Sequence, residues 1–261
     1  MGHWRENGSA ALRALTILLA AVLPWAGYAA LLCFGQTPVV ETGGTAKLPK
    51  LIQTQPVSEK LIALTFDDGP SAVTTPVLLD GLAERGVHAT FFLVGSMIEK
   101  SPEIVLRIVD EGHQIGVHTY DHSSLTGLKG LSAAQFDAQA GVTQRLLTQL
   151  TGQTEFALRP PYGYVDDGVR QRAAGPIILW SIDPEDWRDQ SIQQEVEHIV
   201  SHAQDGAVIL MHDIFRDSVK TALQAVDRLQ AEGYRFVTVE ELFAAYGIDL
   251  IRGEVYYSTT P

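Results

Sequence analysis

The sequence predicts an α/β protein with seven parallel strands, and two observations support this prediction. Short apolar segments alternate with capped helical segments between residues 61 and 239. Several helical segments end in a Glu/Gly pair shortly before the next apolar run, as at Glu111-Gly112 and Glu232-Gly233, and such a glycine stops a helix in the left-handed conformation. Strict alternation implies a parallel sheet with right-handed crossovers, either an open doubly wound sheet or an incomplete barrel.

The expected helices begin at recognisable caps. Thr75-Pro76 and Ser101-Pro102 place a cap residue before a proline at the first helical position. Ser132 to Gln135 and Ser191 to Gln194 have the pattern of capping boxes. We expect strands at 61–67, 89–94, 114–118, 156–159, 177–182, 207–211 and 235–239, and helices near 76–85, 102–111, 132–150, 165–173, 191–203 and 217–232.

Composition excludes several classes of protein. The 261 residues are 46% hydrophobic and 19% charged, which is ordinary for a globular domain. A net charge of −12 and a pI near 5.0 argue against a nucleic-acid partner, because phosphate binding requires clustered Lys and Arg. The single cysteine, Cys33, excludes an intrachain disulfide and a cysteine-based zinc site.

The N-terminal segment is predicted to meet a membrane. Residues 14–34 contain no charged side chain and are long enough to cross a bilayer core. Arg5 and Arg13 precede this run, which predicts that residues 1–13 are cytoplasmic and that the remainder lies outside the cytoplasm. The alternative is a signal peptide cleaved near Gly27-Tyr28-Ala29, which would give a secreted protein. Residues 35–58 are predicted to be a linker, 59–246 the catalytic domain, and 247–261 a tail without a readable signal.

Polar residues directly follow five of the expected strands. Because the carboxyl ends of parallel strands meet at one edge of a sheet or barrel, these residues are expected to form one site. The segments are Asp67-Asp68, His118-Thr119-Tyr120-Asp121-His122, Arg159-Pro160-Pro161-Tyr162-Gly163, Asp183-Pro184-Glu185-Asp186-Trp187 and His212-Asp213.

A metal site is the expected use of the first two segments. Asp67 and Asp68 are adjacent like charges, which repel one another unless a cation lies nearby, although an Asx turn is the simpler alternative. His118 and His122 would share one face if the strand led into a helical turn. Two His and one Asp, with positions left for water, suit a divalent metal; Zn²⁺ is favoured, and Co²⁺, Ni²⁺ or Mn²⁺ are alternatives.

A second histidine pair has the same spacing. His198 and His202 lie within an expected helix and have no strand-end partner. We therefore interpret that pair as part of a solvated helix face.

The ordered motifs resemble one family. Thr65-Phe66-Asp67-Asp68-Gly69-Pro70, the His118/His122 pair, Arg159-Pro160-Pro161-Tyr162-Gly163, Asp183-Pro184-Glu185-Asp186-Trp187 and Leu210-Met211-His212 are similar, in this order, to the motifs of the polysaccharide deacetylases, the NodB-homology or carbohydrate esterase family 4 group. The resemblance covers about residues 59–245. It implies a distorted (β/α)7 barrel and metal-dependent removal of N-acetyl, and sometimes O-acetyl, groups from sugar polymers.

The resemblance also implies a role for each half of the Asp pair. Asp68, His118 and His122 would bind the metal, and Asp67 would be the general base. Arg159 would hold Asp67 ionised and oriented, the alternative being a surface salt bridge.

The remaining roles implied by the resemblance concern the substrate. The backbone N–H of Tyr162 would stabilise the oxyanion, and His212 would be the general acid with Asp186 as its carboxylate partner. Trp187 and Leu210 would form the walls of the acetyl pocket, with core packing as the alternative. Asp183 and Asp213 are expected to support the site from further away, and Ser123 departs from the proline that the family often has after the second histidine.

These expectations combine into a membrane-anchored, monomeric deacetylase acting on an acetylated glycan. Its substrate would be peptidoglycan or a chitin-like polymer with N-acetylglucosamine or N-acetylmuramic acid units. Two alternatives stay open. One is an O-acetyl esterase acting on xylan or an exopolysaccharide, and the other is an inactive wall-glycan-binding or morphogenetic protein.

Overall fold

The computed structural model describes residues 59–126 and 131–260. The expected membrane segment 14–34, the linker 35–58 and Cys33 lie outside the described residues. Within the two described ranges, no helix is both long and apolar enough to span a bilayer.

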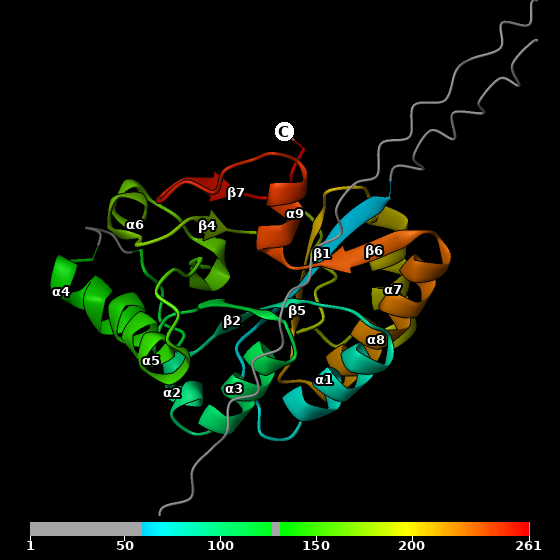
Figure 1. Cartoon of the computed structure of the whole chain (residues 1–261), viewed down its shortest axis with the longest axis horizontal. Coiled ribbons are helices and arrows are strands. Elements are labelled where there is room, and N and C mark those ends of the chain that lie inside the picture. The colour runs from blue at the N-terminus through cyan, green and yellow to red at the C-terminus, as the bar shows by residue number, and fades with distance from the viewer. Residues whose placement is uncertain (1–58, 127–130, 261) are drawn as a thin grey trace, which may run out of the picture. The chain divides into compact units, whose positions relative to one another are not determined.

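Parallel strands form the centre of the domain (Figure 1). The main sheet has the order β3-β2-β1-β5, and β6 pairs with the first half of β1. β2 pairs with the second half of β1, from Thr65 to Asp67. The bounds are β1 Lys60–Asp67, β2 Thr90–Leu93, β3 Gln114–Val117, β5 Val208–His212 and β6 Tyr234–Val237.

Isolated parallel bridges connect the two edges of this sheet. Val117 bridges to Leu158, Leu158 to Ile177, and Ile182 to Ile209 of β5. The strands therefore form an incomplete barrel, which decides between the two architectures that the sequence left open. The expected strand at 156–159 is reduced to its bridge at Leu158, because the two prolines that follow Arg159 have no N–H to donate.

The expected strand at 177–182 is also shorter in the structure. It is represented by β4 (Ile177–Ile178) and the bridge at Ile182. β4 pairs with β7 (Val255–Tyr256), which lies in the tail for which the sequence predicted nothing.

Helices surround the strands. In Figure 1, α4 and α5 lie to the left of the central strands, α3 and α1 lie below them, and α7 and α8 lie to the right. A π-turn at Asp137–Gly141 separates α4 from α5 within the helical segment expected at 132–150. The bounds are α1 Thr75–Glu84, α2 Gly95–Ile98, α3 Pro102–Asp110, α4 Ala133–Phe136, α5 Val142–Thr151, α6 Asp167–Arg172, α7 Ile192–His202, α8 Arg216–Ala231 and α9 Val239–Ala245.

Alternate residues of β1 face two buried layers, as strand geometry requires. Ile62, Leu64 and Phe66 pack in the layer between the strands and the outer helices. Leu61 and Ala63 belong to a second cluster, which fills the barrel interior. Thr65 and Asp67 continue this inward-facing row to the end of the strand, so the interior becomes polar at its carboxyl end.

Helix α9 closes the other end of the interior with apolar side chains. Its residues Leu242 and Phe243 belong to the same cluster as Leu61 and Ala63. The helix begins at a capping box formed by Thr238 and Glu241. The sequence analysis missed this helix because it extended the preceding strand to residue 239.

Candidate active site

Strand pairing places four of the expected residues at the polar end of the barrel interior. Asp67 lies opposite His212 in the pairing of β1 with β5, and Thr65 lies opposite Leu210. Arg159 follows the bridge residue Leu158. β1, β5 and the segment that follows the Leu158 bridge thus contribute side chains to the same end of the interior.

Arg159 is fully buried and makes four hydrogen bonds. Its Nη1 donates to Asp67 Oδ1 at 2.8 Å and to the Thr65 hydroxyl at 2.7 Å. Its Nε and Nη2 donate at 2.9 Å to the carbonyl oxygens of Ile178 and Leu179. Burial lowers the pKa of Arg159, and the adjacent Asp67 carboxylate opposes this shift. The ion pair is therefore an interior one that fixes Asp67, not a surface salt bridge.

Two supporting residues of this ion pair were missed by the sequence analysis. Thr65 accepts from Arg159 and donates to Ile209 O at 2.6 Å. The Phe92 ring lies 4.1 Å from the Arg159 guanidinium carbon. Thr65 could have been found, because it lies two residues before Asp67 and therefore on the same strand face.

Asp68, His118 and His122 form a group with the composition of a metal site. Their candidate ligand atoms all lie within 4.8 Å of one another. Asp68 Oδ1 is 3.4 Å from His118 Nε2 and 3.3 Å from His122 Nε2. These distances bring three potential donor atoms to one point.

Hydrogen bonding around this group fits a cation. His118 Nδ1 lies 2.7 Å from Arg159 O, a carbonyl that can only accept, so Nδ1 carries the proton and Nε2 presents its lone pair toward Asp68. Asp68 Oδ1 is buried and has no hydrogen-bond partner among the described residues. A divalent cation would satisfy both atoms, and the donor set suits one.

The loop geometry at the two histidines differs from the prediction. The sequence would align His118 with His122 only if a helical turn followed the strand, and no such turn forms: Thr119 and His122 have φ values of 65° and 63°, which no right-handed helix contains. Asp68 is likewise left-handed, with φ at 74°. Left-handed non-glycine residues are uncommon and are retained mainly at functional sites, where the surrounding structure holds them.

Charges within the group shift its pKa values. Burial would raise the pKa of Asp68, but the adjacent His118, together with His122 and His212, lowers it overall. Burial lowers the pKa of His122 despite the nearby Asp68 carboxylate. Both shifts favour the deprotonated forms that bind metals.

His212 and Asp186 form a second buried pair. Asp186 accepts from His212 Nδ1 at 2.7 Å and from the His212 backbone N–H at 2.8 Å. Burial alone would lower the pKa of His212, but the hydrogen bond and charge of Asp186 outweigh it and raise the pKa to about 9. His212 is therefore an imidazolium at neutral pH.

The other expected residues have different environments. Tyr162 has φ at 62°, and its exposed ring lies 4.9 Å from the His122 ring. Trp187 is 52% exposed, so core packing does not account for it, whereas Leu210 is 4% exposed. Asp183 accepts from the backbone N–H of Glu185 at 2.9 Å.

Asp213 is buried behind the Asp pair. It accepts a hydrogen bond from Thr75, and its carboxylate packs so closely on Gly69 that a Cβ there would lie 2.4 Å from it. Burial raises the pKa of Asp213 to about 7. Asp213 thus supports the loop that follows Asp68.

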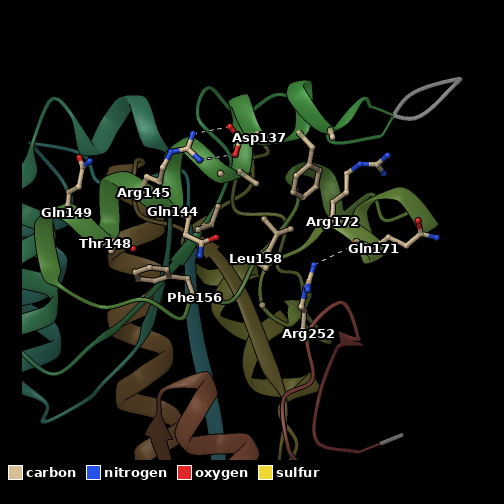
Figure 2. A pocket seen from close by; sticks show the side chains of 17 residues that line it. Asp137, Gln144, Arg145, Thr148, Gln149, Phe156, Leu158, Gln171, Arg172 and Arg252 are labelled. Carbon is tan, nitrogen blue, oxygen red and sulfur yellow. Dashed lines mark hydrogen bonds and ion pairs between the residues drawn. The ribbon is translucent and has the colours of Figure 1, made fainter.

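A cavity lies elsewhere in the domain (Figure 2). It measures about 720 Å³ and is bordered by the helical segment 133–149 and by residues 171–175. Arg145 at its rim is paired with Asp137, and Arg252 donates to the carbonyl oxygen of Ala173. None of the expected site residues lines this cavity, so it is separate from the candidate active site at the strand ends.

The prediction for the second histidine pair is confirmed. His198 and His202 are exposed on α7, and their ring centroids are 4.3 Å apart. In the described part of the chain, the Asp68, His118 and His122 group is the one with metal-site composition.

Fold and site together define an α/β-barrel protein with a metal-type Asp-His-His group at the carboxyl ends of its strands. The sequence profile of the polysaccharide deacetylase family matches residues 54–175. A peptidoglycan-N-acetylglucosamine deacetylase of Bacillus cereus is 36% identical over 197 residues, which cover 72% of this chain and 90% of the relative. The chain belongs to the polysaccharide deacetylase family, as the five motifs predicted.

Other relatives extend the comparison. The peptidoglycan-N-acetylglucosamine deacetylase of Listeria monocytogenes is 38% identical over 216 residues, which cover 83% of this chain but 45% of the relative. The chain thus matches less than half the length of that protein. The solved structure of a family 4 acetyl xylan esterase from Clostridium thermocellum, in complex with a cobalt ion, matches with a TM-score of 0.73 at 28% identity; the match covers 77% of this chain and 100% of that chain.

Proposed function

We propose that this protein is a metal-dependent deacetylase that removes N-acetyl groups from N-acetylglucosamine or N-acetylmuramic acid units of peptidoglycan. The observation that supports this most strongly is the Asp68, His118 and His122 group, which lies beside the buried Asp67–Arg159 pair. The two relatives named as peptidoglycan deacetylases support the choice of substrate.

Asp68, His118 and His122 would hold the divalent cation, for which Zn²⁺ is the favoured candidate and Co²⁺, Ni²⁺ or Mn²⁺ are alternatives. When bound, the cation would polarise the acetyl carbonyl and acidify a water molecule. Asp67 cannot serve as a further ligand without losing its role as a base, so the two adjacent carboxylates have separate tasks.

Asp67 would accept the proton of the attacking water. Its Oδ1 is occupied by Arg159, whereas Oδ2 lies 3.7 Å from His118 Nε2 and therefore faces the metal group. The hydrogen bond from Arg159 fixes the orientation of the carboxylate, as a general base requires.

His212 would protonate the leaving nitrogen. The water oxygen attacks the carbonyl carbon, the C–N bond breaks, and the amine leaves with the proton from His212, giving acetate and an amino sugar. The Asp186 carboxylate keeps His212 protonated, with a pKa of about 9. The imidazolium is thus available as an acid at neutral pH.

Binding of the acetyl group would involve three further residues. The backbone N–H of Tyr162 would donate to the oxygen that gains negative charge. Trp187 and Leu210 would enclose the methyl group. Leu210 pairs with Thr65, which lies two residues before Asp67 on β1. This position near the proposed base supports a role for Leu210 in binding the methyl group.

We further propose that the protein is held at the cell membrane by residues 14–34, with the catalytic domain outside the cytoplasm. This proposal rests on the uncharged run and the preceding arginines. The alternative is secretion after signal-peptide cleavage. Membrane fractionation followed by N-terminal sequencing distinguishes an intact anchor from a cleaved one.

Acetate release from purified peptidoglycan tests the proposed function. The protein should release acetate after metal loading and lose this activity in chelator. Chelator-resistant activity, or no release from any acetylated glycan after loading with each candidate metal, would contradict the proposal.

The match to an acetyl xylan esterase favours one second candidate, O-acetyl ester hydrolysis on xylan. The same residues could catalyse it, because an ester oxygen leaves more readily than an amide nitrogen that has not been protonated. Parallel assays on acetylated xylan and peptidoglycan separate the two activities.

A further inference from the structure

The cavity between α5 and the end of α6 has the size of a small-molecule site (Figure 2). Its volume is about 720 Å³, and pockets that bind small molecules usually measure about 300–1,000 Å³. No residue of the five motifs lines it. The proposed reaction therefore makes no use of this cavity.

The lining of the cavity has an apolar part and a polar part. Buried apolar side chains contribute the first part, namely Val117, Phe136, Phe156 and Leu158. The polar part comes from two directions: side chains of α5 lie on one side of the cavity, and Gln171, Arg172 and Arg252 lie on the other (Figure 2). A ligand with an apolar body and a polar group matches both parts.

The lining carries a positive charge, although the whole chain is strongly acidic. Three arginines and one aspartate line the cavity, which gives a net charge of +2 against −12 for the chain. The aspartate, Asp137, already accepts from Arg145 through two hydrogen bonds at 2.8 Å and 3.0 Å. The two remaining positive charges are those of Arg172 and Arg252.

Backbone carbonyl groups hold these two arginines next to one another. Arg252 Nε donates to Ala173 O at 2.7 Å and its Nη2 donates to Gln171 O at 3.4 Å, so its guanidinium contacts the residues on both sides of Arg172. Arg172 Nη1 donates to Gly168 O at 3.0 Å. Among the described residues, neither guanidinium has a carboxylate partner, and each keeps N–H groups for a ligand.

Close packing of the tail fixes the position of Arg252. Gly253 follows it with φ at 75°, and a Cβ on Gly253 would lie 2.4 Å from Arg170 O. The Gly253 N–H donates to Gly175 O at 3.0 Å. The tail then continues into β7, which pairs with β4. The fold therefore places Arg252 beside α6, and the arginine pair is preorganised.

An organic anion is the ligand that fits this lining. The planar guanidinium group of arginine binds a carboxylate or a phosphate through two parallel hydrogen bonds. The buried apolar side chains offer contacts to a hydrocarbon or aromatic body. A neutral ligand would use the apolar part and leave the positive charges without a partner.

We propose that this cavity binds a small organic anion, whose carboxylate or phosphate group is held by Arg172 and Arg252 and whose apolar body contacts Phe136 and Phe156. The site is separate from the Asp68, His118 and His122 group. It does not depend on the proposed deacetylase function.

Three probes with the same ring system test the proposal: naphthoate, naphthyl phosphate and the neutral naphthalenemethanol. Each is titrated by calorimetry into the full chain loaded with Zn²⁺. We expect saturable binding of at least one anion with a Kd below about 1 mM, and binding of the neutral probe at least about tenfold weaker. Comparison of the two anions shows whether the site selects a carboxylate or a phosphate.

Arg172→Gln and Arg252→Gln remove one positive charge each. Each should weaken binding of the anion about tenfold and leave the neutral probe unchanged, because a hydrogen bond to a charged group is lost. Arg170→Gln is the matched control: Arg170 also lies on α6 but does not line the cavity. Its affinity for all three probes should equal that of the wild type.

Thr148→Trp tests whether the probes occupy this cavity. Thr148 lines it from α5, so a larger side chain there should fill the space and abolish binding of all three probes (Figure 2). Asp68→Asn should bind the anions as the wild type does, since the cavity does not include the metal group. No saturable binding of either anion would overturn the proposal. So would equal affinity for neutral and charged probes, full binding in Thr148→Trp, or unchanged anion binding in both arginine variants.

Discussion

Asp67 and Asp68 are neighbours in the chain, but their environments differ in every respect that matters for chemistry. Asp67 continues the inward-facing row of β1 and is paired with a buried arginine at 2.8 Å. Asp68 turns into the left-handed region and faces two histidine nitrogens at 3.3 Å and 3.4 Å. One carboxylate has a permanent cation as its partner, and the other has neutral donors that need a cation. The alternation of β1 points Asp67 inward, and the left-handed φ of Asp68 then turns that residue toward the histidines. The backbone thus gives the two neighbouring carboxylates different environments, one suited to a base and the other to a metal ligand.

The largest effect is expected for Asp67→Asn, which removes the base but keeps an oxygen for Arg159. Turnover should fall about 10³-fold, within the usual range for general-base catalysis. Steady-state acetate release from peptidoglycan measures this effect. Activity within tenfold of wild type would show that another group accepts the proton.

Arg159→Met tests the cation of the buried Asp67–Arg159 ion pair. The substitution keeps the volume but leaves Asp67 buried without its cation, so the free energy of unfolding should fall by about 3–5 kcal/mol. Urea unfolding of the variant and of the wild type measures this difference in the free energy of unfolding. Arg235→Met is the control, because Arg235 and Glu59 form an exposed pair at 2.9 Å whose loss should cost under about 1 kcal/mol. Equal losses for both variants would contradict the interior role of Arg159.

Asp186→Asn tests the role of His212 as the general acid. His212, with a pKa of about 9, is protonated below that pH, so activity should be lost as pH rises through about 9. Without the Asp186 charge, burial dominates and the pKa of His212 falls. The alkaline limit of the pH–rate profile should then move to lower pH, and kcat at neutral pH should fall about 10²-fold.

Glu185→Gln is the control for that variant, because its carboxylate pairs with exposed Arg188 at 2.7 Å. Its alkaline limit should not move. An unchanged profile in Asp186→Asn would show that His212 is not the acid.

A pH effect outside the site concerns His113, a buried histidine without a carboxylate partner. Its Nδ1 accepts from the Ala89 backbone N–H at 3.0 Å, and burial lowers the pKa to about 4. The unfolded chain binds a proton at this histidine near pH 6.5, so stability falls as pH drops from about 6.5 to about 4, by up to about 3 kcal/mol. His113→Gln should flatten this part of the stability curve in urea unfolding. A slope identical to wild type would show that His113 is not responsible.

The sequence predicted the site residues better than the backbone that holds them. The apolar run before Asp67 predicted β1, and a period of two then fixed which side chains face inward, because that period is a property of any strand. The backbone that brings His118 and His122 together could not be predicted, because no glycine signals the left-handed φ values at Thr119 and His122.

Other features depend on tertiary contacts that no local pattern encodes. The burial of Arg159 under Phe92 joins segments far apart in the chain. Pairing of β7 with β4 likewise could not be read from the tail itself.

Metal content of Asp67→Asn and Asp68→Asn, measured in parallel on purified protein, tests the division between the two carboxylates most directly. Each variant is loaded with Zn²⁺, dialysed and analysed by atomic emission, with affinity measured by calorimetry. The separate roles predict that Asp67→Asn keeps one ion per chain with an affinity near wild type, and that Asp68→Asn loses it. Loss of metal in Asp67→Asn, with retention in Asp68→Asn, would show that the two roles are reversed.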